Sequence, residues 1–266
     1  LAALGFLRLG TYVKFIPYPV TVGFTAGIAI IIAASQITPL LGLTIDGEEP
    51  GPFLEKLPVL FDALPTATPA AIAVGLATIV MIVAIGRLRP RWPAMLIAVA
   101  GGAAATALLG LPVATIGSQF GGIPAGLPAP ALPDLDLARI EAVLPNAIAF
   151  TLLGAIESLL SAVVADGMTG RRHRSNCELV AQGAANVGAA LFGGFCVTGT
   201  IARTATNVRA GARGPVAGML HAGFLLAFVL VAAPLAAYIP LASLAGVLAV
   251  VAWNMIEKDA IAVLFR

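Results

Sequence analysis

A single carboxylate interrupts one of the long apolar stretches of this sequence. Glu157 is the only charged residue between positions 142 and 165. A carboxylate among apolar residues must find a partner, line a water-filled cavity or take up a proton. Ser161 follows one helical turn later and would share the same helix face. Glu157 is therefore a candidate for coupling proton uptake to a change of state, with Ser161 supplying a hydroxyl.

A second polar group lies between positions 195 and 208, where Thr198, Gly199, Thr200 and Arg203 follow one another closely. If a helix begins here, threonine can cap its free N–H groups, and glycine leaves the backbone approachable. A helix N-terminus offers unpaired N–H donors and about half a positive charge, which favours an anion. Arg203 would add a permanent charge in the first turn. These residues predict an anion-binding site.

Both groups also have plainer interpretations. Arg203 could pair with an acidic side chain or extend to a lipid headgroup. Glu157 and Arg203 could instead form a static ion pair that only joins two helices. Isolated charges inside a membrane are rare and usually functional, so anion binding is the preferred reading for Arg203.

The composition indicates where these residues must lie. Hydrophobic residues make up 59% of the 266 positions and charged residues 11%, against about 25% charged in a soluble domain. A helix that spans a membrane needs about 20 mostly apolar residues. Apolar runs bounded by charge and by Gly or Pro predict seven spans, at about 18–38, 68–86, 93–112, 144–166, 178–194, 216–234 and 236–256. The fold class is an all-α polytopic membrane protein.

Loop charges orient these spans, because short cytoplasmic loops are enriched in Lys and Arg. Three arginines lie in the 87–92 loop and three in the 167–177 loop, so both loops are expected inside. The connection 39–66 carries acidic residues against a lone Lys56, and 113–143 is rich in Pro and Gly with three acidic residues, so both are expected outside. Their acidic residues are Asp46, Glu48, Glu49, Glu55, Asp62, Asp134, Asp136 and Glu141.

With this orientation, the number of membrane crossings does not match the loop charges after position 194. The span 178–194 should end outside, yet Arg209 and Arg213 follow it and favour the inside. The stretch between them is too short and too polar for a full span, which predicts an extended entry and a half-helix near 195–210. Irregular backbone at membrane depth persists only where protein buries it or where it lines a cavity. The alternative is an external loop with two exceptional arginines.

The remaining polar residues suggest structure more than chemistry. Glu178, Gln182 and Asn186 recur every four residues and form a stripe suited to hydrogen bonding between helices. His173 and His221 are isolated in the sequence, so no metal site is expected. No nucleophile motif or phosphate loop supports an enzyme, and no cofactor is implied. The net charge of +2 gives no reason to expect a nucleic-acid partner.

Three segments resemble the sulfate permease (SulP) family of anion transporters. The run 154–223, which contains the letters CVTGTIARTATN, is similar to the signature region of that family. The run 12–37 resembles its fifth span, and 239–255 is also similar. The resemblance covers nearly the whole chain.

The resemblance implies a fold of fourteen segments in two inverted repeats of seven, followed by a cytoplasmic STAS domain. This chain would be a fragment running from the end of segment 4 through segment 12. Residues 1–140 would end the first repeat and 141–266 would form most of the second, without the STAS domain. The family's anion site would fall on Gly199, Thr200 and Arg203, and its acidic position on Glu157.

In sodium-coupled bicarbonate members of the family, the acidic position looks like an Asp that is followed four residues later by Thr. This chain has Glu157 and Ser161 at these two positions. The resemblance therefore favours protons over sodium as the coupling ion.

The segments around 114–120 and 252–255 look most similar to the bacterial aerobic C4-dicarboxylate transporter. The sequence thus predicts secondary active transport of small anions, such as succinate or fumarate, in the inner membrane. Sulfate or bicarbonate transport, an uncoupled channel or exchanger, and a purely structural subunit are the alternatives. A homodimer of the full-length protein is compatible with the resemblance.

Overall fold

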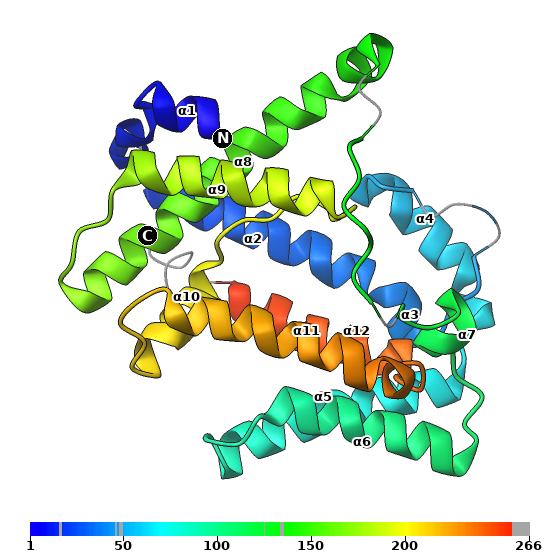
Figure 1. Ribbon diagram of the computed structural model, residues 1–266. Coiled ribbons are helices and arrows are strands. Elements are labelled where there is room, and N and C mark those ends of the chain that lie inside the picture. Colours follow the sequence, from blue (N-terminus) through cyan, green and yellow to red (C-terminus); the bar gives the residue numbers. More distant parts are fainter. Residues whose placement is uncertain (16–17, 46, 48–49, 125, 134–135, 257–266) are drawn as a thin grey trace. The chain divides into compact units, whose positions relative to one another are not determined.

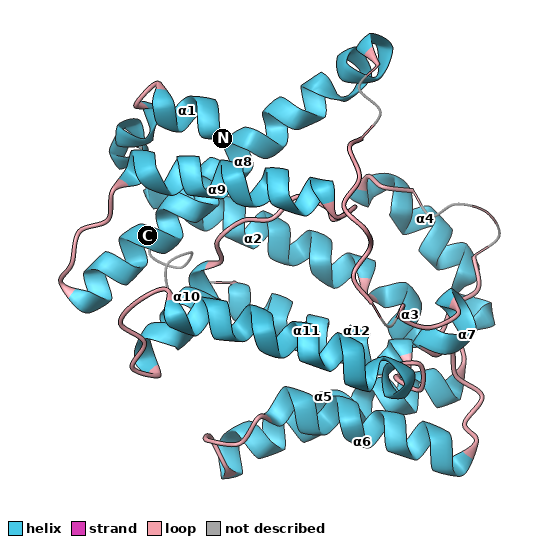
Figure 2. Ribbon diagram, in the orientation of Figure 1, coloured by secondary structure: helices cyan, strands magenta, loops and turns pink. Residues whose placement is uncertain are grey.

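The computed structural model describes residues 1–15, 18–45, 47, 50–124, 126–133 and 136–256. The described chain is almost entirely helical (Figure 2). It divides into two compact units, one formed by residues 1–17 and 126–225 and the other by 18–125 and 226–266. Each unit therefore draws on both of the predicted repeats. Four acidic residues of the predicted outer loops, Asp46, Glu48, Glu49 and Asp134, lie outside the described residues.

The first unit contains α1 (Ala2–Phe6), the 3-10 helix η1 (Leu9–Phe15), α8 (Leu137–Thr169), α9 (Ser175–Leu191), α10 (Ile201–Arg209) and the start of α11 (Val216–Ala236). In it, α8 packs against α10 and α9, and α1 packs against α9 (Figure 1). Leu159 and Leu179 are fully buried between α8 and α9, with Leu1 and Leu4 against them.

Small residues allow α1 to lie directly on α9. A Cβ placed on Gly183 would come within 2.5 Å of the backbone nitrogen of Ala2, and one on Gly5 within 2.7 Å of the carbonyl oxygen of Asn176. Helices in membranes gain little from hydrophobic exclusion, so close backbone contact supplies much of their attraction. Glycine at these two positions is what permits it.

The second unit contains α2 (Tyr18–Ser35), α3 (Ile37–Leu41), α4 (Phe53–Ala63), η2 (Leu64–Thr66), α5 (Pro69–Leu88), α6 (Ala94–Leu109), α7 (Ile116–Phe120) and α12 (Leu241–Met255). α12 is central, because it packs against α2, α3, α5 and α6. Its Ser243 is fully buried and accepts a hydrogen bond of 3.0 Å from the hydroxyl of Thr78 on α5. Close packing and this polar pair hold α12 to α5.

The predicted spans are confirmed as helices, with differences at their ends. By length and composition, Val22–Leu41, Pro69–Leu88, Leu137–Thr169 and Val216–Ala236 are long and apolar enough to cross a membrane, and α6 and α12 are shorter apolar helices. α8 begins about seven residues before the predicted start at 144, because the Ala, Leu, Arg and Glu residues ahead of Pro145 favour a helix. The connection 39–66, predicted as a loop, contains the short helix α4.

Candidate functional site

The helix α9 ends where the sequence predicts a break in the membrane. Its last residue is Leu191, and residues 192–200 are not helical (Figure 2). Gly193 has a φ of 69°, a left-handed conformation that glycine adopts without strain. The N–H groups of Gly193 and Gly194 bond back to the carbonyls of Ala190 and Ala189 and close the helix end. An α-helix begins again at Ile201, so the predicted extended entry and half-helix are confirmed.

The polar stripe of α9 holds the extended segment by its backbone. The side-chain amide of Asn186 donates to the carbonyl oxygen of Val197 at 2.8 Å and accepts the N–H of Val197 at 3.0 Å. The amide of Gln182 donates to the same carbonyl at 2.9 Å. Both backbone polar groups of Val197 are thereby satisfied without secondary structure. The stripe is structural, as predicted, but two of its members, Gln182 and Asn186, bond the extended segment instead of another helix.

The other side of the segment lies against the middle of α8. The hydroxyl of Thr198 donates to the carbonyl oxygen of Gly154 at 3.1 Å. A Cβ on Gly199 would lie 3.4 Å from the Cα of Ser158 and 3.7 Å from the Cβ of Ser161, so the backbone passes in van der Waals contact with α8. Gly154 lies near the centre of the predicted span 144–166. The break thus packs beside the middle of a membrane helix, which argues against an external loop.

The half-helix α10 presents an uncapped N-terminus to this region. Thr200 is its N-cap residue, with extended backbone, but its side chain makes no capping hydrogen bond. The expectation that Thr198 and Thr200 cap the helix is wrong, because the hydroxyl of Thr198 bonds to α8 instead. α10 has nine residues and is roughly 13 Å long at about 1.5 Å per residue, less than half of a ~30 Å hydrocarbon layer. Its N-terminus therefore retains free N–H donors for an anion.

The two candidate coupling residues, Glu157 and Ser161, lie on α8 and differ in burial. Glu157 is half-buried, and among the described residues it forms no ion pair with Arg203, which is exposed. The static Glu157–Arg203 pair is therefore not supported. Ser161 is 4% exposed, and its hydroxyl oxygen has no hydrogen-bond partner among the described residues. A buried hydroxyl without a partner is costly unless water or a ligand satisfies it.

Ser158 is a polar contact that the sequence did not predict. It is 1% exposed, and its hydroxyl donates to the Glu178 carboxylate at 2.7 Å. This bond joins α8 to α9 directly under the extended segment, beside Gly199. The four-residue spacing of the stripe identified Glu178 as a bonding residue, but nothing in the sequence identified its partner.

Two basic loops meet at the far end of the first unit. The guanidinium of Arg171 donates to the carbonyl oxygen of Arg213 at 2.9 Å. The loop after α10 therefore lies at the same end of the unit as the loop between α8 and α9. This agrees with the expectation from the loop charges that both basic loops lie on the same side of the membrane.

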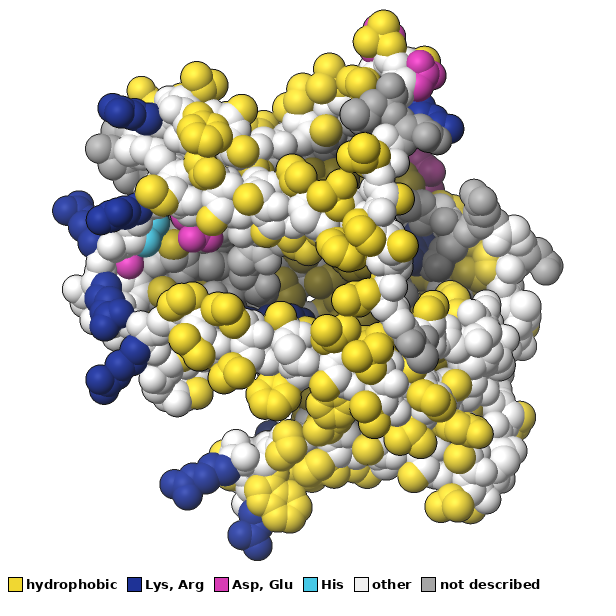
Figure 3. All heavy atoms as spheres, in the orientation of Figure 1, with side chains coloured by type: hydrophobic (Ala, Val, Ile, Leu, Met, Phe, Trp, Pro, Cys, Tyr) yellow, Lys and Arg dark blue, Asp and Glu magenta, His cyan; other side chains and the backbone are white. Residues whose placement is uncertain are grey.

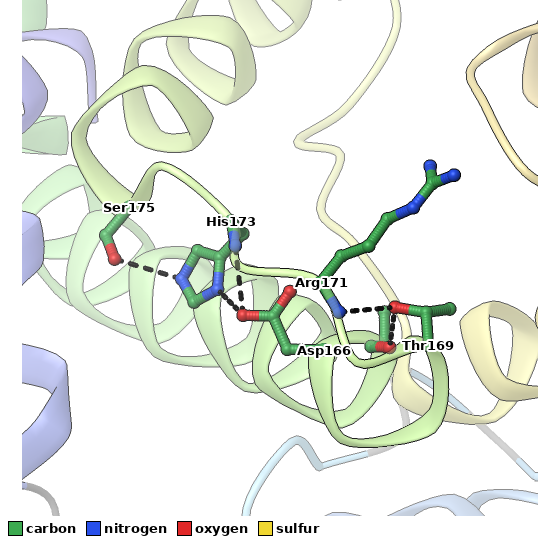
Figure 4. Close-up of polar contacts among 6 residues, drawn as sticks. Asp166, Thr169, Arg171, His173 and Ser175 are labelled. Carbon is green, nitrogen blue, oxygen red and sulfur yellow. Dashed lines mark hydrogen bonds and ion pairs between the residues drawn. The ribbon is translucent and has the colours of Figure 1, made fainter.

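His173, in the loop between α8 and α9, was expected to be isolated but has hydrogen-bond partners. One ring nitrogen lies 2.6 Å from the carboxylate of Asp166 and the other 2.9 Å from the hydroxyl of Ser175 (Figure 4). The backbone N–H of His173 also donates to Asp166. These bonds fix the turn that joins α8 to α9. His173 was missed because its partner is brought near only by the turn.

Comparisons with known proteins identify the class. The fold is that of the membrane domain of an anion transporter, and a model of the sulfate permease family matches residues 1–266. The chain belongs to the sulfate permease family. It is 43% identical to a putative sulfate transporter, YvdB, of Bacillus subtilis over 100% of this chain and 50% of the relative. It is 37% identical to the bicarbonate transporter BicA of Synechocystis, over 92% of this chain and 43% of the relative. The chain thus spans about half the length of these relatives.

Solved structures agree on the fold. The transmembrane domain of a cyanobacterial bicarbonate transporter, BicA, is similar with a TM-score of 0.86 and 36% identity, over 96% of this chain and 64% of that structure. The murine anion transporter Slc26a9, in an inward-facing state, has a TM-score of 0.84 at 21% identity, over 99% of this chain and 44% of that structure. The latter likeness concerns the fold alone. The predicted likeness to the C4-dicarboxylate transporter is not shown by these relatives and stays a prediction.

The contacts of Asn186 generate a prediction about the break. In the full-length protein, Asn186→Leu should lower the free energy of unfolding by about 1–3 kcal/mol, because both backbone groups of Val197 lose a partner. It should also weaken anion binding, because the extended segment that leads into the N-terminus of α10 is no longer held to α9. Thermal melting in detergent and equilibrium binding would measure the two effects. Val187→Leu, on the neighbouring exposed position, is the matched control. Unchanged melting and affinity in Asn186→Leu would show that the stripe does not hold the segment.

Proposed function

We propose that the full-length protein is a secondary active transporter of small oxyanions that works by alternating access. The observation that carries the proposal is the uncapped N-terminus of α10 beside the middle of α8. Its free N–H groups and the positive end of the helix dipole suit an anion. Thr198, Gly199, Thr200 and Arg203 are the proposed binding residues.

The proposed coupling residues are Glu157 and Ser161. Glu157 is a half-buried carboxylate on α8, next in sequence to Ser158, which contacts the extended segment, and no described residue forms an ion pair with it. A carboxylate in this setting can gain and lose a proton as the surrounding cavity opens to either side. The unpartnered hydroxyl of Ser161 lies beside Gly199, where it can bond a water or an ion that accompanies the substrate. We therefore propose proton coupling, with sodium as the competing ion.

The family relatives favour an inorganic substrate. The similar proteins are named for sulfate and bicarbonate, and the free N–H groups of one helix end match a single compact oxyanion. A C4-dicarboxylate carries two anionic groups, so it would need a second cationic group beyond α10. We propose bicarbonate or sulfate as the substrate, with succinate and fumarate as the comparison that tests the sequence likeness.

Uptake by the purified full-length protein in proteoliposomes tests this function. Labelled bicarbonate, sulfate and succinate would be compared under an imposed pH gradient and, separately, a sodium gradient. We expect saturable uptake of one inorganic oxyanion that exceeds its equilibrium level when protons enter. Uptake that only approaches equilibrium would indicate a channel or an uncoupled exchanger. The absence of saturable uptake for every anion would indicate a structural subunit.

Removal of the arginine charge tests the binding site. Arg203→Ala should weaken binding of the transported anion about 10- to 100-fold, the range of a lost charge-assisted hydrogen bond. Arg209→Ala removes an equal charge at the other end of α10 and should leave the affinity nearly unchanged. Binding to detergent-solubilised protein would be measured by calorimetry. Wild-type affinity in Arg203→Ala would assign Arg203 to structure.

Removal of the Glu157 charge tests coupling. Glu157→Gln keeps the side-chain shape and imitates the protonated form, so accumulation driven by a pH gradient should disappear. Anion binding and passive exchange should partly survive, because α10 and Arg203 are untouched. Glu178→Gln changes a neighbouring carboxylate that already accepts a bond from Ser158 and serves as the control. A stable Glu157→Gln protein that still concentrates its anion, with unchanged pH dependence, would rule out Glu157 as the coupling residue.

A further inference from the structure

An apolar groove lies in the second unit, at the end where α5 gives way to α6. Its volume is about 980 Å³, and it is lined by residues of α5, of the 90–93 turn, of the first turn of α6 and of the last turns of α12. Ile82, Val83 and Val250 form part of its wall. Two tryptophans, Trp92 and Trp253, line it and are 59% and 64% exposed. Neither the anion site nor the proposed coupling residues belong to it.

Arginines border this groove on one side. Arg87 follows Gly86, which lines the groove, and Arg89 and Arg91 alternate with the lining residues Pro90 and Trp92. All three arginines are exposed. Figure 3 shows the basic side chains at this end of α5 and α6, lower left in the view, next to apolar side chains. Exposed arginines therefore border one side of the groove, while its walls are mostly apolar, with Asn254 as the polar side chain among the lining residues.

The groove also lies where lipid headgroups are expected. Arginine-rich loops face the cytoplasm, whose leaflet carries the anionic lipids. Tryptophan is enriched at the boundary between headgroups and acyl chains, where its ring is apolar and its N–H is polar. An acyl chain fits walls such as Ile82 and Val250, and a phosphate accepts hydrogen bonds from guanidinium groups.

We propose that this groove binds an anionic phospholipid of the cytoplasmic leaflet. One acyl chain occupies the space between α5, α6 and α12, and the headgroup phosphate contacts the arginines of the 87–91 segment. The lipid links the α5–α6 turn to the end of α12. The two tryptophans mark the depth at which the chain enters.

Trp92 and Trp253 make the proposal measurable, because they are the only tryptophans of the 266 residues. The full-length protein would be reconstituted in phosphatidylcholine with a small fraction of acyl-brominated lipid, which quenches nearby tryptophan. Brominated phosphatidylglycerol would be compared with brominated phosphatidylcholine. Subtraction of the Trp92→Phe/Trp253→Phe protein isolates the signal of the groove. We expect quenching by phosphatidylglycerol at an apparent affinity about fivefold or more above that for phosphatidylcholine, the preference that one arginine near anionic lipid supplies.

Substitutions of the arginines test the headgroup contact. Arg87→Gln/Arg89→Gln/Arg91→Gln should abolish the preference for phosphatidylglycerol, and the triple Lys variant should keep most of it. Arg171→Gln/Arg172→Gln/Arg174→Gln removes the same charge from the other basic loop and should have no effect on it. High salt on the wild-type protein gives the same test without any substitution, because it screens headgroup attraction.

Three results would overturn the proposal. Equal quenching by both brominated lipids would mean that the tryptophans meet only bulk lipid. Negligible quenching by either would mean that a protein segment fills the groove. A preference for phosphatidylglycerol that persists in the triple Gln variant and in high salt would place the headgroup elsewhere.

Discussion

The hydrogen bonds between the α9 stripe and Val197 are the interaction on which the candidate site depends. Nonhelical backbone inside a bilayer leaves N–H and C=O groups that no water can satisfy, at a cost of several kcal/mol each. Asn186 meets both groups of Val197, and Gln182 adds a second donor. The segment can therefore stay extended, and α10 can start at Ile201 with free N–H groups at its end. Without these hydrogen bonds, a continuous helix, or a loop outside the membrane, would have the lower free energy.

Small residues allow the extended segment to pack closely against α8, on the side opposite α9. Gly199 lets the extended backbone touch α8 at Ser158, and Gly183 lets α1 lie on α9. The bond from Ser158 to Glu178 then satisfies a buried hydroxyl and ties α8 to α9 beneath the break. Polar pairs in membranes contribute modestly, about 0.6 kcal/mol on average, so geometry matters more than the strength of any one bond. The break is fixed by several such contacts from two helices.

Some polar residues of the first unit have hydrogen-bond partners and others have none in the described part of the chain. Those with partners are the ones with a proposed structural role, and those without are the ones with a proposed role in binding or coupling. Glu178, Gln182 and Asn186 all have described partners. Ser161, the N-terminus of α10 and Glu157 are without side-chain partners among the described residues. Groups that a folded protein leaves open near mid-membrane are costly unless a ligand, a proton or water meets them. In the second unit, the buried hydroxyl of Thr106 on α6 is also without a partner among the described residues. It does not line the tryptophan-lined groove, whose walls are mostly apolar and suit lipid.

The sequence by itself determined the helical spans and the break, and it supplied the proposed residues of the candidate site. The length of an apolar run reflects the thickness of the bilayer, and the charge of a loop indicates the side of the membrane on which the loop lies. Arg209 and Arg213 favoured the side opposite to the one that the count of spans gave, and this conflict was enough to predict a half-helix. Only the tertiary structure decided how the break is held, because Asn186 and Val197 are eleven residues apart and their meeting depends on how the chain turns at Gly193. The same applies to the Ser158–Glu178 bond, to the missing cap at Thr200 and to the partners of His173. Residue type and spacing fix which groups can bond along one helix, whereas bonds across a turn or between helices depend on packing that spacing does not encode.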